Sequence, residues 1–243
     1  MSDDNGSPSP SRGYEKIAPK PEGIYAITPD GWPLSGLLDC VEAALEAGVK
    51  WVQYRDKQRS AEDRFLYGCG LVRLVKFYEG HLIVNDSLPI CKELTKAGYA
   101  PSGIHLGKED GDIREARIAL GPKGVIGSSC YDEFERAAIS IKHGASYVAF
   151  GTLFPSITKP KGVKAPLSLI TKTATAFRVP VVGIGGIDAV NVIRVAEAGA
   201  SAAAVITSLF GVYPDPEKTY RSAMQLVENF AHGVRVREET AKA

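Results

Sequence analysis

Eight short apolar segments recur along the chain, and each is followed by a longer segment whose apolar residues repeat at helical spacing. Short apolar runs separated by helices are typical of strands buried on both faces of a parallel sheet. The predicted strands span 23–29, 50–56, 81–86, 103–107, 125–130, 147–151, 180–186 and 202–208. The predicted helices span 35–47, 60–79, 87–97, 112–120, 132–143, 166–177, 188–198 and 216–231.

Glycine follows several predicted helices at the point where the chain must turn back into a strand: Gly48, Gly98, Gly144 and Gly199. Glycine is the residue best suited to the left-handed conformation that ends a helix. Eight strand-helix units indicate an α/β fold, a (β/α)8 TIM barrel, as a single domain over residues 22–231. An open doubly wound sheet is the alternative, because periodicity alone does not prove closure.

The two ends of the chain differ in composition from this domain. Residues 1–21 are rich in Ser, Pro, Gly and Asp and have almost no apolar content, which predicts a disordered N-terminal tail. Residues 232–243 are polar and charged, which predicts a flexible C-terminal tail.

The composition limits which binding partners and which cellular compartment are expected for this chain. The 29 basic and 28 acidic residues nearly cancel, so no overall charge favours nucleic acid or a membrane surface. The four cysteines are widely spaced, form no zinc or disulfide pattern, and fit the reducing cytoplasm. No segment has the length of a membrane span. The sequence leaves the oligomeric state open, a homo-oligomer included.

Polar and basic side chains end the second predicted strand. Side-chain alternation places Gln53, Arg55 and Lys57 on one face. A buried strand carries such residues where a polar partner awaits them. Arg55 and Lys57 could clamp a phosphate, and Gln53 could pair with a heterocycle. An ion pair between Arg55 and an aspartate, closing the barrel mouth, explains the segment equally well.

Carboxylates follow the next two strands. Asn85 and Asp86 end the third, and Asp110 follows the fourth. Neighbouring strand ends lie about 5 Å apart, so the two carboxylates could share one hard cation, for which the oxygen ligands favour Mg²⁺. Each aspartate taken alone favours a helix N-cap instead. Both together, facing a cationic second strand, favour the metal.

The last two strands end in a second candidate anion site. Strand seven runs into Gly183-Ile-Gly185-Gly186, and strand eight into Ile206-Thr207. Glycines here let backbone N–H groups approach a phosphate where phosphate-binding barrels commonly hold one. The alternative is that they only permit close packing of strand and helix.

Other strand ends are less informative. Ser129 could hydrogen-bond a ligand, Cys130 lacks an activating partner, and His105 is expected to be a satisfied core histidine. The loop over 151–166, rich in hydroxyls and lysines, lies between the two anion sites, and its first half is expected to act as a lid.

Seven motifs together resemble, in order and spacing, the thiamine-phosphate synthase family from about residue 23 to 211. They are Gln53-Tyr-Arg55-Asp-Lys57, Asn85-Asp86, Gly103-Ile-His-Leu-Gly107-Lys-Glu-Asp110, Ser129, Phe154-Pro-Ser156-Ile-Thr158-Lys159, Ile184-Gly-Gly186-Ile and Val205-Ile206-Thr207. The resemblance implies a transferase that joins 4-amino-2-methyl-5-hydroxymethylpyrimidine diphosphate to 4-methyl-5-hydroxyethylthiazole phosphate. Pyrophosphate would leave first, in a dissociative step, and the thiazole nitrogen would capture the resulting cation.

The resemblance also implies a role for each matching residue. The residues implied to contact the pyrimidine diphosphate are Gln53, Arg55, Lys57, Asn85, Ser129 and Lys159. Of these, Arg55, Lys57 and Lys159 are the implied catalytic residues. The residues implied to contact the thiazole phosphate are Ser156, Thr158, Gly186, Ile206 and Thr207. The implied Mg²⁺ ligands are Asp86 and Asp110.

The chain departs from the family pattern at Lys108, at Ser156 and at 100–102, and none of these changes removes an implied ligand. One rival interpretation is a thiazole tautomerase, which needs no pyrophosphate clamp. Another is a non-catalytic barrel that binds thiazole phosphate or thiamine phosphate.

Overall fold

The computed structural model describes residues 18–155 and 163–242. Within these ranges eight parallel strands pair in chain order and close into a barrel, which confirms the (β/α)8 prediction and excludes an open sheet. The strands are β1 (Gly23–Ile27), β2 (Trp51–Tyr54), β3 (His81–Asn85), β4 (Gly103–Leu106), β5 (Val125–Tyr131), β6 (Tyr147–Phe150), β7 (Val181–Ile184) and β8 (Ala202–Val205).

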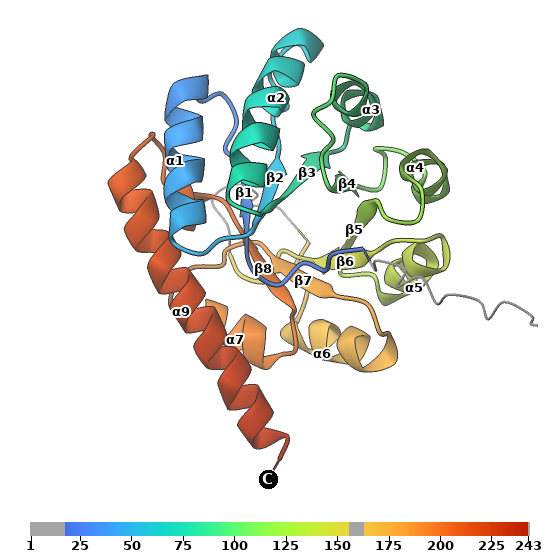
Figure 1. Ribbon diagram of the computed structural model, residues 1–243. Coiled ribbons are helices and arrows are strands. Elements are labelled where there is room, and N and C mark those ends of the chain that lie inside the picture. The colour runs from blue at the N-terminus through green and yellow to red at the C-terminus, as the bar shows by residue number, and fades with distance from the viewer. Residues whose placement is uncertain (1–17, 156–162, 243) are drawn as a thin grey trace, which may run out of the picture.

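Helices surround the barrel on all sides (Figure 1). They are α1 (Leu34–Glu46), α2 (Ala61–Phe77), α3 (Leu88–Lys96), α4 (Ile113–Leu120), α5 (Phe134–Lys142), α6 (Leu167–Ala176), α7 (Val192–Glu197), α8 (Thr207–Phe210) and α9 (Pro216–Thr240). The predicted C-terminal glycines have positive φ, for example 88° at Gly98 and 100° at Gly199. The short helix α8 lies in a stretch that the sequence predicted as the end of a strand and a connection.

Side-chain alternation along the strands produces two cores. One lies inside the barrel and contains Tyr25, Trp51, Ile83 and Tyr147 among its buried members. The other lies between the outside of the barrel and the helices, where buried apolar side chains of the described residues form one large cluster and two smaller ones. The interior core lies directly beneath the residues at the carboxyl ends of the strands, which form the rim of the barrel.

The predicted C-terminal tail is corrected for residues 232–240, because helix α9 continues to Thr240 and packs along α7 and α1 (Figure 1). Phe230 and Gly233 are buried, and a Cβ at Gly233 would come within 2.5 Å of the Ile193 carbonyl oxygen. Arg237 donates a hydrogen bond to the Ala196 carbonyl oxygen at 2.9 Å. The polar composition of this stretch therefore belongs to the solvent face of a docked helix.

The predicted N-terminal tail is also corrected at its inner end. Residues 1–17 lie outside the described ranges, but Pro21 is buried and Ala18 packs against the interior core. Residues 18–21 thus belong to the barrel domain and not to a tail.

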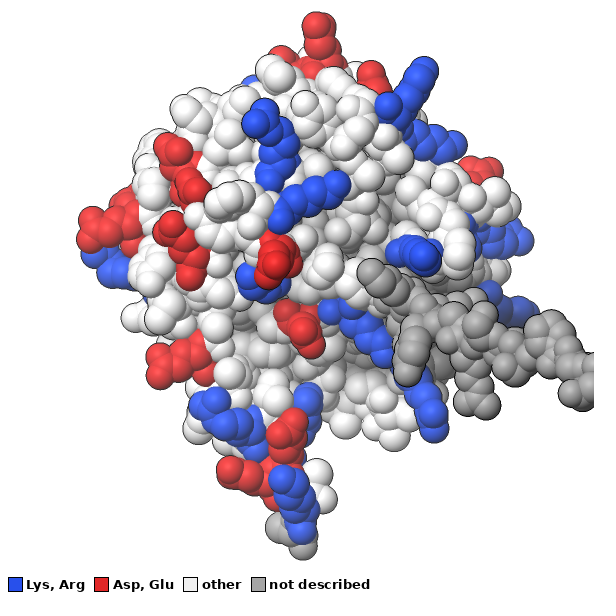
Figure 2. Space-filling model, in the orientation of Figure 1, with Lys and Arg blue, Asp and Glu red and all other residues white. Residues whose placement is uncertain are grey.

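Basic and acidic side chains are interspersed over the face in Figure 2, in keeping with the near-balanced composition. Among the described residues, no helix is both long enough and apolar enough to cross a bilayer.

Candidate active site

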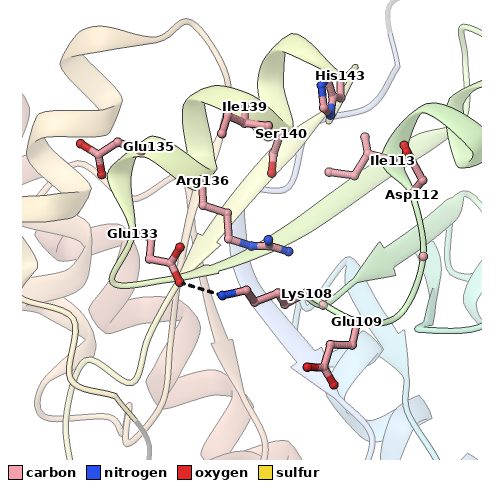
Figure 3. A pocket seen from close by; sticks show the side chains of 12 residues that line it. Lys108, Glu109, Asp112, Ile113, Glu133, Glu135, Arg136, Ile139, Ser140 and His143 are labelled. Atoms are coloured by element: carbon pink, nitrogen blue, oxygen red, sulfur yellow. Dashed lines mark ion pairs between the residues drawn. The ribbon is translucent and has the colours of Figure 1, made fainter.

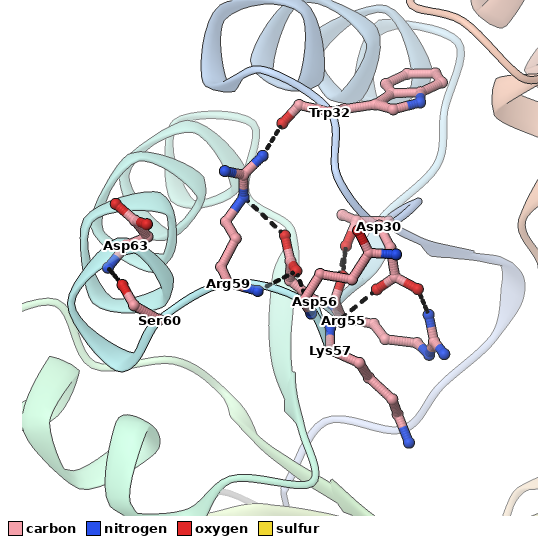
Figure 4. A network of polar contacts seen from close by, with 10 residues as sticks. Asp30, Trp32, Arg55, Asp56, Lys57, Arg59, Ser60 and Asp63 are labelled. Carbon is pink, nitrogen blue, oxygen red and sulfur yellow. Dashed lines mark hydrogen bonds and ion pairs between the residues drawn. The ribbon is translucent and has the colours of Figure 1, made fainter.

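Arg55 is held rigidly at the end of β2 by the loop that follows β1 (Figure 4). The buried Thr28 hydroxyl accepts a hydrogen bond from the Arg55 N–H and donates one to the Arg55 carbonyl oxygen, both at 2.9 Å. Asp30 forms an ion pair with the Arg55 guanidinium and accepts a hydrogen bond from the Lys57 N–H at 3.0 Å. The sequence-based alternative, an Arg55–aspartate ion pair, is therefore present with Asp30 as partner.

The intervening Asp56 has a structural role. Its carboxylate is buried, accepts hydrogen bonds from the backbone of Gln58 and Arg59, and pairs with the Arg59 guanidinium at 2.9 Å. Arg59 also donates to the Trp32 carbonyl oxygen at 2.6 Å (Figure 4). These contacts fix the turn that directs Arg55 and Lys57 toward the rim.

Asp86 and Asp110 lie together at the ends of β3 and β4. The Lys57 ammonium lies 3.1 Å from the Asp86 carboxylate. Burial raises the pKa of Asp110, and the charge of Asp86 and a hydrogen bond shared with Asp86 raise that pKa further, against a lowering by Lys57. The structure thus brings two carboxylates and one ammonium into a single cluster.

Neither carboxylate caps a helix, which removes the alternative that the sequence left open. Ser87 caps α3 by accepting a hydrogen bond from the Ile90 N–H, and Asp112 caps α4 through the Arg114 N–H. Asp110 instead accepts from the Gly107 N–H at 3.1 Å, which folds the loop after β4 back toward the rim. Asp86 has a φ of 61°, an uncommon conformation for a residue other than glycine.

Gln53 and Ser129 are the ends of one buried hydrogen-bond chain across the barrel interior. The Gln53 amide nitrogen lies 3.2 Å from the Tyr25 hydroxyl, and this hydroxyl lies 2.9 Å from that of Tyr147. The Tyr147 hydroxyl lies 2.9 Å from Nδ1 of His105, whose Nε2 lies 2.8 Å from the Ser129 hydroxyl. His105 is thus a satisfied core histidine, as expected, but it contacts a predicted ligand of the pyrimidine.

Burial also agrees with the expectation for Cys130, because it raises the pKa of that thiol to about 11 and keeps it protonated near neutral pH. A protonated buried thiol is a poor nucleophile. Covalent catalysis through Cys130 has no support in its surroundings.

The ends of β6, β7 and β8 form the opposite side of the rim. The Phe154 N–H donates to the Gly185 carbonyl oxygen at 3.0 Å, so the chain after β6 runs beside the glycines that follow β7. Gly186 has a φ of 65°, and a Cβ there would come within 2.3 Å of the Pro155 carbonyl oxygen. Glycine is required at this position for both reasons.

Ile206 and Thr207 lie at the start of helix α8, directly after β8. The neighbouring Ser208 hydroxyl is buried and has no hydrogen-bond partner among the described residues, a feature that the sequence did not reveal. Three predicted ligands, Ser156, Thr158 and Lys159, fall outside the described residues, and so does most of the expected lid.

A groove of about 530 Å³ opens between α4 and α5 (Figure 3). Lys108 and Glu133 form an ion pair across it at 3.7 Å, so this Lys108, a departure from the family pattern, is turned toward α5. The groove contains none of the predicted ligands. The candidate site is therefore the rim itself, with Asn85 and the Lys57–Asp86–Asp110 cluster on one side and Gly186, Ile206 and Thr207 on the other.

The thiamine monophosphate synthase family (TMP-TENI) matches residues 24–209, which include every predicted ligand of both sites. The chain belongs to this family. The match confirms the resemblance drawn from the motifs, and with it the assignment to the thiamine-phosphate synthases, transferases of thiamine biosynthesis.

Curated relatives agree over most of their length. The chain is 46% identical to the thiamine-phosphate synthase of Chromobacterium violaceum over 194 residues, which are 80% of this chain and 91% of the relative. It is 44% identical to that of Halorhodospira halophila over 199 residues, 82% of this chain and 91% of the relative. The solved structure of thiamine phosphate pyrophosphorylase from Pyrococcus furiosus superposes with a TM-score of 0.74 at 26% identity and covers 87% of this chain and 97% of that one.

Proposed function

We propose that the chain joins 4-amino-2-methyl-5-hydroxymethylpyrimidine diphosphate to 4-methyl-5-hydroxyethylthiazole phosphate, in the cytoplasm, giving thiamine phosphate and pyrophosphate. The observation that carries the proposal is the cluster of Lys57, Asp86 and Asp110 on the rim. The guanidinium of Arg55 pairs with Asp30, the same carboxylate that accepts a hydrogen bond from the Lys57 N–H. A site that mixes cations with paired carboxylates suits a diphosphate bound together with a divalent cation. A tautomerase has no use for such a cluster.

The donor set fits Mg²⁺. Among the described residues no group of three or more His, Cys, Asp or Glu side chains could form a complete protein cage. Mg²⁺ is usually bound through one or two carboxylates, water and substrate phosphate. Burial, and after it the charge of Asp86, raise the pKa of Asp110 although Lys57 lowers it, so a bound cation would stabilise the ionised pair of carboxylates. Asp86 and Asp110 would hold the ion, which would neutralise charge that gathers on the leaving pyrophosphate.

The chain's own cations would serve the same leaving group. Asp30 and Thr28 hold Arg55 at the rim, so its planar donors are oriented before the substrate binds. Lys57 and Lys159 would add ammonium groups, and Asn85 would donate to the diphosphate. Because bond cleavage precedes bond formation in the proposed dissociative step, stabilisation of the leaving group is the main requirement, and no general base is needed.

The second substrate would bind on the other side of the rim. Backbone N–H groups at Gly186, Ile206 and Thr207 would bind the thiazole phosphate, with hydroxyls of Ser156 and Thr158 contributing from the loop after β6. The pyrimidine would lie between the two anion sites, against Gln53 and Ser129. This arrangement would present the thiazole nitrogen to the pyrimidine-methyl carbon as pyrophosphate departs.

The test is an end-point and initial-rate assay of the purified chain with both substrates and Mg²⁺, with thiamine phosphate and pyrophosphate measured separately. We expect both products in equal amounts, and none when either substrate is omitted or the metal is chelated. Isomerisation of the thiazole substrate alone would support a tautomerase, and tight binding of thiamine phosphate without turnover would support a non-catalytic barrel. No product over hours at micromolar enzyme would refute the proposal. Sedimentation of the same sample would test for a homo-oligomer.

A further inference from the structure

The hydrogen-bond chain beneath the rim joins two residues that face the proposed pyrimidine site from different strands. Gln53, Tyr25, Tyr147 and His105 are each at most 8% exposed, and Ser129 is partly buried. Each internal member has partners on both sides, so its donors and acceptors can be assigned along the chain.

The structure turns the Gln53 amide nitrogen toward Tyr25, and with this orientation the direction of every hydrogen bond in the series follows from counting protons. Burial raises the pKa of Tyr25 and of Tyr147 far above neutral pH, so each phenol carries one proton. The Gln53 amide nitrogen can only donate, so the Tyr25 hydroxyl accepts from it and must donate its own proton to Tyr147. Tyr147, having accepted, must donate to Nδ1 of His105.

The same count of protons determines which ring nitrogen of His105 is protonated. A nitrogen that accepts a hydrogen bond carries no proton, so neutral His105 holds its proton on Nε2 and donates it to the Ser129 hydroxyl. Ser129 then keeps its own proton for a ligand. Among the described residues the Gln53 amide oxygen has no hydrogen-bond partner, and it is left to accept from a ligand.

The opposite direction requires a different set of states. A proton on Nδ1 of His105 would make Tyr147 an acceptor, Tyr147 would then donate to Tyr25, and Tyr25 would have to donate to Gln53. An amide nitrogen cannot accept, so the Gln53 side chain would have to turn its oxygen inward and its nitrogen toward the ligand. The tautomer of His105 and the orientation of the Gln53 amide are therefore coupled through the two tyrosines.

We propose that Tyr25, Tyr147 and His105 are positioning residues that fix Gln53 as an acceptor and Ser129 as a donor toward the aminopyrimidine. The proposal rests on the proposed function for the identity of the ligand. An exocyclic amine can donate to the Gln53 oxygen, whereas an oxo group at the same ring position cannot. The interior chain thereby selects the amino form of the ring from a distance, without contact between the tyrosine hydroxyls and the substrate.

The tautomer can be measured without any substrate. In protein labelled with ¹⁵N-histidine, two-bond ¹H–¹⁵N correlations separate the Nε2–H form from the Nδ1–H form, and His105→Asn assigns the signal. We expect the Nε2–H form in the wild type, and a mixture of both forms in Tyr147→Phe, because the fixed donor to Nδ1 is gone. An Nδ1–H or doubly protonated His105 in the wild type would overturn the proposal.

The functional consequence is measured as discrimination between two substrates. The amino pyrimidine diphosphate is compared with the analogue that carries an oxo group in place of the amine, through the ratio of their kcat/KM values. We expect Tyr25→Phe to lower this ratio at least tenfold, about 1.4 kcal/mol, because the Gln53 amide becomes free to rotate. The KM for the thiazole phosphate should stay within twofold. Comparing variants cancels the intrinsic reactivity of the two substrates.

Tyr54→Phe is the matched control. Tyr54 is the next residue after Gln53 on β2, is equally buried, and its hydroxyl has no hydrogen-bond partner among the described residues. Its removal should leave both the tautomer and the substrate ratio unchanged. An unchanged ratio in Tyr25→Phe, or an equal fall in Tyr54→Phe, would refute the positioning role. Failure of the wild type to make thiamine phosphate would refute the proposed function alone, because the tautomer measurement needs no turnover.

Discussion

Replacing Gly186 with alanine should separate an effect on the proposed thiazole phosphate site from an effect on the stability of the barrel. The backbone at Gly186 has a φ of 65°, where a side chain costs about 1–2 kcal/mol. The new Cβ would also lie 2.3 Å from the Pro155 carbonyl oxygen and 2.6 Å from that of Phe154. These distances are roughly 1 Å below ordinary contact, and so the chain after β6 must move by about that amount.

Gly98→Ala is the control for the first of these two costs. Gly98 ends helix α3 with a φ of 88°, and a Cβ there has no neighbour within 4 Å. Its substitution should lower stability by about 1–2 kcal/mol, equivalent to a fall in Tm of roughly 2–8 °C for a chain of this size, with no effect on catalysis. Any further loss of stability in Gly186→Ala measures the cost of the steric clash with residues 154 and 155.

The assay is a titration of thiazole phosphate at saturating pyrimidine diphosphate, with Tm measured on the same samples. Displacing a substrate-positioning segment by about 1 Å can cost up to a hundredfold in rate, so we expect kcat/KM for thiazole phosphate to fall by roughly ten- to a hundredfold in Gly186→Ala. A Gly186→Ala variant whose Tm falls only as far as that of Gly98→Ala, with an unchanged kcat/KM for thiazole phosphate, would refute both the contact and the proposed placement of the phosphate.

Three further predictions concern the proposed diphosphate site. Asp86→Asn should raise the Mg²⁺ concentration for half-maximal activity roughly tenfold or more, since loss of even an outer partner of a metal ligand commonly costs that much; an unchanged titration would limit Asp86 to holding Lys57. Lys159→Ala should lower kcat by roughly a hundredfold through lost charge stabilisation, and near-normal turnover would place Lys159 away from the leaving group. The raised pKa of Asp110 means that its ionisation opposes folding, a penalty absent at low pH and present above the folded pKa. Without metal, Asp110→Asn should therefore have a higher Tm than the wild type near pH 7 and no advantage near pH 3, whereas Mg²⁺ should raise the Tm of the wild type more; a lower Tm near pH 7 would contradict this sign.

Local patterns predicted the barrel because each of its units is specified locally. An apolar run, a capping glycine and a helical repeat act within one strand-helix unit, and the closed order β1 to β8 then follows from packing the repeated units side by side. The same logic placed the rim residues, since strand ends of a parallel barrel share one face. The clustering of Lys57 with Asp86 confirms that inference at the level of side chains.

Local sequence patterns do not predict contacts between segments that are distant in the sequence. Asp30, which holds Arg55, lies in a loop that gives no sign of its partner on the next strand. The helical continuation of α9 did have a signal: Phe230, Val234 and Arg237 recur at helical spacing and contact the barrel side, but the polar residues between them dominated the composition. Composition describes the exposed face of such a helix, and periodicity describes the buried one.

The interior of the barrel shows why the polar layer under the rim needs a functional reason. Tyr25, Tyr147 and His105 occupy inward positions, where apolar side chains would fill the space without the cost of burying hydroxyls and an imidazole. The hydrogen bonds among these side chains offset that cost only while the whole series is present. The loss of one member leaves its neighbours without a hydrogen-bond partner. A fully apolar layer would support the same barrel, but it would leave the amide of Gln53 free to rotate and the hydroxyl of Ser129 without a defined donor. The polar layer is therefore best explained by what it holds above it, the pair of side chains that faces the proposed pyrimidine site.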